Sequence, residues 1–363
     1  MKLVLIGDGE SPHLLKWARA LAAVPGLALY AVSSRGFVDA FEAIVPAERR
    51  LVLDTDPRHG GGNVTVLRRL PTLGRWLAEV DADWLHPHYL TSHGTLAWAA
   101  RRGWRLRAKI AGSAWGSDIL VTPQQGRAYR WLTSRVLHAC ALCTSDSQHM
   151  SERMRELGAG EVMTFPFGLE ALPKQNVRKT DWLFFSNRGL EPIYRPERVL
   201  ATFVAIAALK PEARLVVAND GSLRASLEAQ ARSLGLADRI EFVGRLDAKA
   251  QGTYYARARW FLSLPVSDSV SVSVLEAMAH ECLPLLSELP ANRELLADGQ
   301  RGLILAEGEE AHGEALVARL ETLLAEGETV GAVNRDWVAR HALFPPAVRR
   351  FVDRLKALDA PTS

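Results

Sequence analysis

A serine-rich stretch between residues 261 and 279 combines residue types that can hold a phosphorylated sugar. A strand-like run ends near Leu264, polar residues follow, and a helix is expected to start around Val274 with Glu276 in its first turn. The N–H groups at such a helix start, with serine hydroxyls beside them, can hold a phosphate. A carboxylate in the same turn can accept hydrogen bonds from ribose hydroxyls. The stretch predicts a sugar-nucleotide site, although serine caps and a dipole-complementing acid would explain its parts separately.

The first strand-to-helix turn, residues 7–13, begins like a dinucleotide-binding G-x-G-x-x-G loop. Pro12 stands at the third glycine, and the second strand ends in Ser33-Ser34 without the acid that would hold an adenosine ribose. This disfavours a nicotinamide or flavin dehydrogenase. The turn lies at a predicted helix N-terminus, where N–H groups can hold an anion, and a plain turn is an equal alternative.

Histidines and cysteines give weaker signals. His86, His88 and His93 cluster at a strand end without the carboxylate spacing of a metal site, so structural and cleft roles are equally compatible with each. Cys140 and Cys143 match C-x-x-C, but they lie in an apolar run without a second cysteine pair. Ordinary packing therefore explains both thiols better than redox or metal chemistry.

The positive charge of the chain is concentrated in one region. Its net charge is +3, yet residues 101–135 hold eight basic residues against one acid, Asp118, with aromatic residues interleaved. A solvated face and a surface for anionic lipid headgroups or phosphorylated ligands are equally compatible with this pattern. Nucleic-acid binding is disfavoured because no nucleic-acid-binding motif accompanies it. The eight residues are Arg101, Arg102, Arg105, Arg107, Lys109, Arg127, Arg130 and Arg135.

Length and composition indicate a two-domain globular protein. The chain has 363 residues, of which 48% are hydrophobic and 23% charged, which argues against disorder and a membrane-embedded chain. Its longest apolar runs, such as residues 3–6 and 137–142, fall short of the roughly 18 to 20 residues that cross a bilayer. Three cysteines cannot form a disulfide framework, and residues 2–6 read as a strand rather than a secretion leader. We expect a cytoplasmic protein, or one peripheral to the cytoplasmic face of the inner membrane.

Short apolar runs alternate with helical patterns, which predicts parallel sheets covered on both faces. Two such series, joined near residues 168–173, predict two doubly wound α/β domains with a cleft that faces strand-end loops from both. The expected strands are 3–6, 27–32, 84–88, 109–112, 182–186, 214–218, 239–243, 260–264 and 283–286, and the expected helices include 14–24, 90–101, 198–208, 223–236 and 274–279.

The serine-rich stretch also carries a family resemblance. Asp268 and Glu276 are separated by seven residues, Leu-Glu-Ala-Met-Ala follows at 275–279, and Leu-Pro-Leu-Leu and Asn-Arg-Glu-Leu-Leu come at 283–286 and 292–296. This resembles the E-x7-E region of retaining glycosyltransferases of the GT-B fold, family four, also called group 1. The resemblance implies a fold of two Rossmann-like domains and covers nearly the whole chain.

Further segments imply the site residues. Residues 184–188 resemble the strand whose arginine, here Arg188, holds the donor diphosphate. Residues 216–224 and 242–246 resemble the family's G-x-G-L turn and the segment that flanks the base. Residues 84–89 and 116–118 resemble its D-h-h-H-x-H and H-G-s-D segments. The implied catalytic residues are Asp268, Arg188, Arg195 and His88, the donor-binding residues Glu276, Ser271, Val272, Ser273, Asn219, Gly244 and Arg245, and the acceptor-side residues Gly9, Glu10, His13, Trp115 and Asp118.

Three positions depart from the family pattern. Asp268 replaces the usual glutamate and is one methylene shorter, so it must reach the donor sugar differently. Trp115 stands where many members have a histidine. The usual lysine after the phosphate-binding arginine is absent, and Arg195 is the nearest replacement, which can hold two phosphate oxygens in a fork.

The resemblance implies a retaining transfer of a sugar from a nucleoside-diphosphate donor, with a UDP-sugar favoured and GDP-mannose second. The implied acceptor is a glycan or lipid-linked intermediate of cell-envelope polysaccharide or lipopolysaccharide synthesis. No cofactor and no metal ion are expected, because arginines and helix N–H groups can stabilise the departing diphosphate. The pairs Asp54/Asp56 and Asp81/Asp83 do not follow strands, as a Mg²⁺-binding D-x-D would. The alternatives are a non-catalytic sugar- or nucleotide-binding protein and another GT-B enzyme, such as a phosphorylase or epimerase.

The expected domains are an acceptor-side domain over residues 1–172, a nucleotide-sugar-binding domain over 173–343, and a terminal helix over 344–363 that crosses back to the first. Pro345 and Pro346 suit a break and a helix start. Apolar residues at 348, 351, 352, 355 and 358 recur at helical spacing, and in GT-B proteins such a helix ties the domains together.

Overall fold

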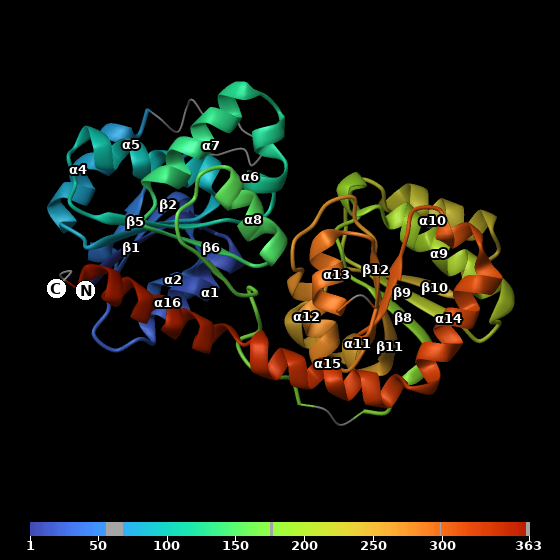
Figure 1. Ribbon diagram of the computed structural model, residues 1–363. Helices are drawn as coiled ribbons and strands as arrows, with labels where there is room; N and C mark the ends of the chain where they lie inside the picture. Colours follow the sequence, from blue (N-terminus) through green and yellow to red (C-terminus); the bar gives the residue numbers. More distant parts are fainter. Residues whose placement is uncertain (56–67, 175–176, 298, 361–363) are drawn as a thin grey trace. The chain divides into compact units, whose positions relative to one another are not determined.

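The computed structural model describes residues 1–55, 68–174, 177–297 and 299–360, which form two compact α/β units (Figure 1). The first comprises Met1–Pro166 and Phe344–Ser363, and the second comprises Phe167–Leu343. The predicted fold class of two Rossmann-like units is confirmed. No helix among the described residues has both the length and the apolar character needed to cross a membrane.

The first unit is built on a parallel sheet that, within the described residues, has seven strands in the order β3-β2-β1-β4-β5-β6-β7. The strands are β1 (Lys2–Gly9), β2 (Ala28–Phe37), β3 (Arg50–Val52), β4 (Trp84–Pro87), β5 (Lys109–Ser113), β6 (Leu142–Ser145) and β7 (Val162–Thr164). The helices are α1 (Pro12–Ala22), α2 (Asp39–Glu42), α4 (Leu70–Val80), α5 (Thr95–Gly103), α6 (Ser117–Leu120), α7 (Arg127–Ala139), α8 (Gln148–Glu156) and α16 (Phe344–Asp359).

The second unit repeats this design with six strands, counted over its described residues, in the order β10-β9-β8-β11-β12-β13. They are β8 (Thr180–Ser186), β9 (Arg214–Ala218), β10 (Ile240–Gly244), β11 (Ala258–Ser263), β12 (Leu283–Ser287) and β13 (Leu303–Leu305). Helices α9 (Pro196–Leu209), α10 (Arg224–Ser233) and α14 (Gly313–Ala325) share one core, and α11 (Ala248–Arg257), α12 (Val272–Ala279) and α13 (Pro290–Leu296) share another. Helix α15 (Gly327–His341) contributes side chains to both cores.

Local sequence explains where the elements begin. Helix α1 starts with Pro12 after Ser11, whose side chain accepts a hydrogen bond from the His13 N–H, so cap and proline both fix the start. The strands at the sheet centres are mainly apolar and largely buried because helices cover both faces.

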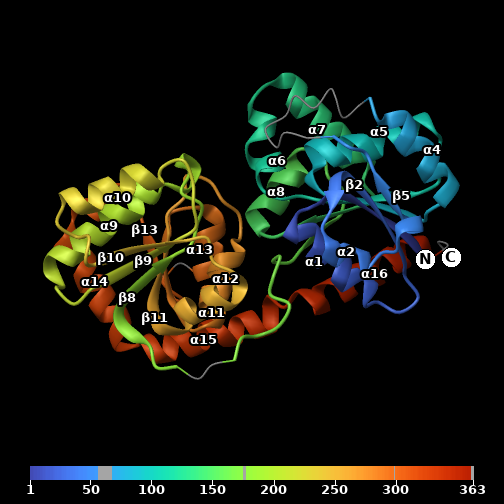
Figure 2. The ribbon, with the colours of Figure 1, turned by 180° about the vertical axis from the view of Figure 1, so that it is seen from behind.

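The terminal helix α16 packs within the first unit, beside α1, as both ribbon views show (Figures 1 and 2). Its apolar stripe is buried, with Phe351 5.4 Å from the ring of Trp17 between centroids. At its far end Asp359 accepts hydrogen bonds from the Trp84 indole (2.6 Å) and the Lys109 ammonium (2.9 Å). The helix begins at Phe344, ahead of both prolines.

The second unit starts six residues before the boundary expected after residue 172. Leu169 N–H donates to the Ala342 carbonyl at 2.8 Å. A Cβ at Gly168 would lie 1.8 Å from the same oxygen, so only glycine allows this approach. These contacts hold residues 167–172 against the end of α15 and place them with the second unit.

Replacing Phe351 by alanine should destabilise the first unit by about 3 to 5 kcal/mol, because it removes a fully buried ring packed against Trp17 and His86. Lys356→Ala, on the exposed side of α16, is the matched control and should stay within about 0.5 kcal/mol. Denaturant unfolding of both variants measures the difference. Equal stability of the two would show that α16 does not stabilise this unit.

Candidate functional site

In each sheet the strand order reverses between two central neighbours. The chain moves outward in opposite directions from β1 and β4 in the first unit, and from β8 and β11 in the second. At such a switch point the loops at the carboxyl ends of the strands diverge and leave a crevice, where open α/β sheets bind ligands. Predicted site residues follow all four of these strands.

The second switch point is centred on Arg188, which follows β8. Its guanidinium pairs with the Asp268 carboxylate at 2.8 Å and donates to the Ser271 hydroxyl. It also lies 4.5 Å over the ring of Tyr194. Burial raises the pKa of Asp268 while the nearby Arg188 opposes this shift. The structure therefore brings together three of the predicted residues, Arg188, Asp268 and Ser271.

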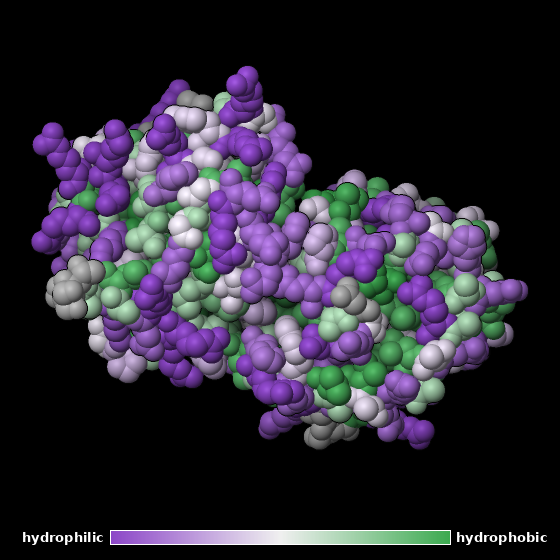
Figure 3. Space-filling model, viewed as in Figure 1, coloured by the Kyte–Doolittle hydropathy of each residue, from purple (hydrophilic) through white to green (hydrophobic). Residues whose placement is uncertain are grey.

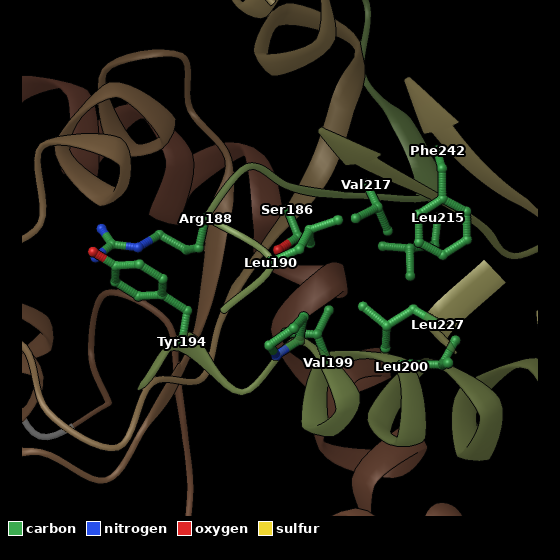
Figure 4. Close-up of a pocket in the computed structure, with 11 residues that line it drawn as sticks. Ser186, Arg188, Leu190, Tyr194, Val199, Leu200, Leu215, Val217, Leu227 and Phe242 are labelled. Carbon is green, nitrogen blue, oxygen red and sulfur yellow. The ribbon is translucent and has the colours of Figure 1, made fainter. Parts of the chain in front are cut away.

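Figure 4 shows Arg188 and Tyr194 side by side at one end of a cavity whose remaining lining is mainly apolar. The cavity has a volume of about 10 Å³, which is room for about one water. It is a small gap between the sheet and helices α9 and α10. The cavity is therefore too small and too apolar to hold a nucleotide, and its link to α12 is Arg188, which donates to the N-cap residue Ser271.

Helix α12 starts at Val272, two residues earlier than expected, with Ser271 as its N-cap residue. The Ser271 side chain does not cap the helix but accepts from Arg188, so a cation lies at the start of α12 beside the amides of Val272 and Ser273. First-turn amides of a helix have no partner within it and carry partial positive charge. The earlier start corrects one prediction, because Glu276 lies in the second turn rather than the first.

A buried tyrosine that the sequence did not single out holds Glu276. The Tyr255 hydroxyl lies 3.1 Å from both Glu276 Oε2 and the Ser273 carbonyl, and it accepts from Asn187 Nδ2 at 2.7 Å. Burial, and then the Glu276 charge, raise the pKa of Tyr255 well above its usual value, so it stays a neutral donor. No local signal marks Tyr255, because only the packing of α11 against β8 and α12 brings it here.

Asn219 and Gly244 join the ends of β9 and β10 to this site. Asn219 N–H donates to the Gly244 carbonyl at 2.6 Å, and its side-chain amide donates to the Asn187 carbonyl at 3.3 Å. Both residues have positive φ angles, 82° and 71°. Arg245 is exposed and makes no hydrogen bond or ion pair with any residue in the described ranges.

Arg195 is engaged elsewhere. Its guanidinium makes two hydrogen bonds to the Glu307 carboxylate, at 2.7 and 2.6 Å, and this contact raises its pKa. The structure thus places Arg195 on Glu307 rather than on Asp268 or Ser271. A fork that is already filled by a carboxylate must open before it can hold a phosphate.

At the first switch point, histidine and tryptophan side chains from the segments that follow β1, β4 and β5 lie close together. The Trp115 indole N–H donates to His88 Nδ1 at 3.1 Å, which assigns the proton of neutral His88 to Nε2. The His13 ring lies 4.9 Å from Trp115, and Tyr89 stacks on it at 5.9 Å. The structure therefore brings His13, His88 and Trp115 together.

Asp118 holds the backbone of this cluster in place through hydrogen bonds. It is fully buried, and its two oxygens accept the N–H groups of Trp115 (2.9 Å) and Leu90 (2.8 Å). Burial raises the pKa of Asp118 to about 6, against the opposing effect of these hydrogen bonds. Asp118 is thus a positioning residue for Trp115.

The structure also gives the surroundings of the remaining first-unit residues. A Cβ at Gly9 would meet the Phe37 ring at 2.4 Å, so this glycine permits close packing of β1 on β2. Glu10 is exposed, and its N–H donates to Asp8. His86 and His93 are buried and hydrogen-bonded to Ser113 and to the His88 carbonyl. Cys140 and Cys143 are buried free thiols, and the described part of the chain contains no cluster of three His, Cys, Asp or Glu residues placed to hold a metal.

Replacing Tyr255 by phenylalanine should cost the second unit about 1 to 3 kcal/mol, because it removes a buried hydroxyl that hydrogen-bonds to Asn187, Ser273 and Glu276. Tyr254→Phe is the matched control, because the hydrogen bonds to Ser273 and Glu276 come from the hydroxyl of Tyr255 and not from that of Tyr254. Thermal unfolding of both variants measures the difference. A Tyr255→Phe variant as stable as the control would remove Tyr255 from its positioning role.

The stability of the first unit should fall on acidification below pH 6.5. Burial lowers the pKa of His86 to about 3 and that of His88 well below its usual value. Both stay neutral in the fold, while the unfolded chain binds their protons below about pH 6.5. Asp118 acts oppositely, because its pKa is raised to about 6 in the fold.

The two histidines outweigh the one carboxylate, so we expect a net loss of about 2 to 3 kcal/mol between pH 7 and pH 5. Denaturant titrations at the two pH values measure it. His86→Gln should shrink the loss, whereas His312→Gln in the second unit should not. A first unit of equal stability at both pH values would contradict buried neutral histidines.

Comparisons with known proteins agree with this geometry. Residues 169–335 match the family model "Glycosyl transferases group 1", and residues 2–147 match "Glycosyl transferase 4-like". The alpha-monoglucosyldiacylglycerol synthase of Streptococcus pneumoniae is 26% identical over 126 residues, which are 35% of this chain and 29% of the synthase. The D-inositol 3-phosphate glycosyltransferase 2 of Catenulispora acidiphila is 26% identical over 315 residues, 76% of this chain and 72% of that protein.

A solved structure has the same fold across both units. HepE of Anabaena, crystallised with UDP, superposes with a TM-score of 0.76 at 13% identity, covering 98% of this chain and all of HepE. The two family models together span most of the described chain, on both of its units. The protein therefore belongs to the group 1 glycosyltransferases, with the GT-B fold.

Proposed function

We propose that this glycosyltransferase moves a sugar from a nucleoside-diphosphate sugar to a glycan or lipid-linked acceptor, with retention of anomeric configuration and without a metal ion. The observation that carries the proposal is Arg188, held by Asp268 beside the start of α12 at a switch point. A guanidinium and free helix amides stabilise the charge that develops on a departing diphosphate. HepE has been solved with UDP and with UDP-glucose, which favours a UDP-sugar over GDP-mannose.

The second unit would hold the donor through its switch-point residues. Arg188, with the amides of Val272 and Ser273, faces the diphosphate, and Glu276, oriented by Tyr255, accepts from the ribose. Gly244 and Arg245 lie beside the base, and Asn219 connects their loop to Asn187. Asp268 orients Arg188 and meets a hydroxyl of the donor sugar.

The reaction would break the bond between the anomeric carbon and the diphosphate oxygen and form a bond from that carbon to the acceptor oxygen on the same face. The acceptor proton passes to the departing phosphate, so no protein base is obligatory. The charge of the leaving group falls on Arg188 and the α12 amides, which supply the stabilisation that a metal ion would give.

The D-x-D pair Asp81/Asp83 lies just before β4, at the opposite end of that strand from the carboxyl end where open α/β sheets bind ligands. Asp81 pairs with Arg107 at 2.5 Å, and Asp83 accepts the Lys2 N–H at 2.7 Å, at the amino end of β4. The expectation that the other pair follows no strand was wrong, because Asp54 comes two residues after the end of β3, and Asp56 lies outside the described residues.

We assign the acceptor to the first unit, around His88, His13 and Trp115. The names of the two relatives fit a lipid or a phosphorylated acceptor, because one is a synthase of monoglucosyldiacylglycerol and the other a D-inositol 3-phosphate glycosyltransferase. Cell-envelope polysaccharide or lipopolysaccharide synthesis in the cytoplasm would supply such acceptors.

A transfer assay separates this function from its alternatives. We expect nucleoside diphosphate to be released only when donor and acceptor are both present, with a product whose anomeric configuration, read by NMR, matches the donor. Formation of a sugar 1-phosphate from a glycan and inorganic phosphate would indicate a phosphorylase, and binding without turnover a binding protein. An inverted product, or a complete loss in EDTA that Mg²⁺ restores, would contradict the mechanism.

Replacing Arg188 by alanine should lower kcat about 100- to 1000-fold, as expected when one donor to a developing negative charge is removed. Arg232→Ala, an exposed arginine on α10, is the control and should retain full activity. Arg195→Ala tests whether Arg195 leaves Glu307 during turnover. An Arg188→Ala enzyme within twofold of wild type would remove Arg188 from the diphosphate site.

A further inference from the structure

One face of helix α7 carries cations and an exposed tryptophan but no acid. Arg127, Trp131 and Arg135 follow one another at intervals of four residues, and Arg130 lies beside them. All four side chains are exposed, and Trp131 retains 56% of its surface. The Arg135 guanidinium lies 5.5 Å from the centre of the Trp131 ring. We call these four residues the α7 face.

No acidic residue that the structure describes pairs with the arginines of the α7 face. Between β4 and β6 the only acidic residue is Asp118, which is fully buried and faces the N–H groups of Leu90 and Trp115. Arg107 and Lys109 pair with Asp81 and Asp359 from other segments. The arginines of the α7 face form no ion pair with any residue that the structure describes.

Other exposed cations lie on and just after the neighbouring helix α5. Arg102 and Arg105, at the end of the neighbouring helix α5, are exposed, and α5 packs against α7. In the view of Figure 3, hydrophilic side chains project over α5 and α7. The opposite face of α7 is firmly docked in the unit, with Val136 and Leu137 fully buried.

The α7 face combines an exposed tryptophan with three arginines, which suit the two regions of an anionic bilayer surface. Tryptophan settles at the boundary between headgroups and acyl chains, and basic side chains are attracted to acidic headgroups. A soluble anionic ligand would reward the arginines but not an apolar ring held out in water.

We propose that the α7 face docks the first unit on an anionic lipid surface, with Trp131 inserted between headgroups. The inference rests on the proposed function, since a lipid-linked acceptor is reached at such a surface. Docking here confines the enzyme to the membrane that carries the acceptor, without any contribution from the donor residues of the second unit.

The test is co-sedimentation of the full chain with vesicles of phosphatidylcholine alone or mixed equally with phosphatidylglycerol. We expect binding only to the mixed vesicles, with an affinity that falls as salt is raised. Changing Arg127, Arg130 and Arg135 together to glutamine should weaken binding about 100-fold, at about fivefold per arginine, and flatten the salt dependence. Trp131→Ala should weaken binding while leaving the salt dependence unchanged.

The matched control changes the same charge on the second unit, through glutamine at Arg232, Lys249 and Arg257, which are all exposed. This variant should bind mixed vesicles like the wild type. The proposal fails if the α7 variants bind like wild type, if both triple variants lose binding equally, or if wild type ignores both vesicle types. It fails equally if heparin binds through the α7 face while vesicles do not.

Failure of the proposed function is read separately, from the thermal stabilisation of each variant by UDP. Because the α7 face lies outside the donor residues, the α7 variants should keep the wild-type stabilisation even when vesicle binding is lost. If the wild type binds mixed vesicles but no nucleotide stabilises it, the donor assignment is wrong while the docking proposal still holds.

Discussion

The arrangement of both candidate sites depends on one topological constraint, the reversal of strand order within a parallel sheet. Right-handed crossovers place successive helices on one face of a sheet, and the chain must change direction to cover the other. That change occurs between β1 and β4 and again between β8 and β11. Only there do two strand-end loops diverge, so only there can a guanidinium, a helix start and a carboxylate from distant segments meet.

Charge burial shapes the second unit around this point. A partly buried cation such as Arg188 is tolerable because Asp268 and Ser271 satisfy its donors. The same logic places Tyr255 beneath Glu276, where its neutral hydroxyl satisfies a carboxylate that the crevice needs oriented. The first unit uses the inverse device, since Asp118 lacks a cation and relies on backbone N–H groups to hold Trp115 and Leu90.

The sequence predicted the features that are local or periodic. Strand-helix alternation indicated both sheets, and the spacing of Asp268 and Glu276 led to α12 and its loop. The short strands β3, β6, β7 and β13 were not predicted, because strands of three or four residues carry little or no alternation. Pairing was also out of reach. The residues around Arg195 do not indicate that its guanidinium binds Glu307, and those around Tyr255 do not indicate its hydrogen bond to Glu276. Both contacts form only when elements distant in the sequence pack together.

The start of α12 shows why boundaries matter for chemistry. The sequence placed it near Val274, but Ser271 provides an extended N-cap and the helix begins at Val272. Two residues turn a helix by about 200°, so the shift decides which side chains share a face with the free amides. It moved Glu276 out of the first turn and brought Ser271 to Arg188, which is the arrangement that the proposed diphosphate site requires.

The most direct measurement of the central claim is thermal stabilisation of wild type and Arg188→Ala by the uridine series of nucleoside, monophosphate and diphosphate, with the guanosine series beside it. At about 100 times its Kd, a ligand adds about 2.7 kcal/mol. If Arg188 and the start of α12 hold the second phosphate, the diphosphate must stabilise wild type far more than the monophosphate does, and Arg188→Ala must abolish that difference. A diphosphate that stabilises both proteins equally would place the donor phosphates somewhere else.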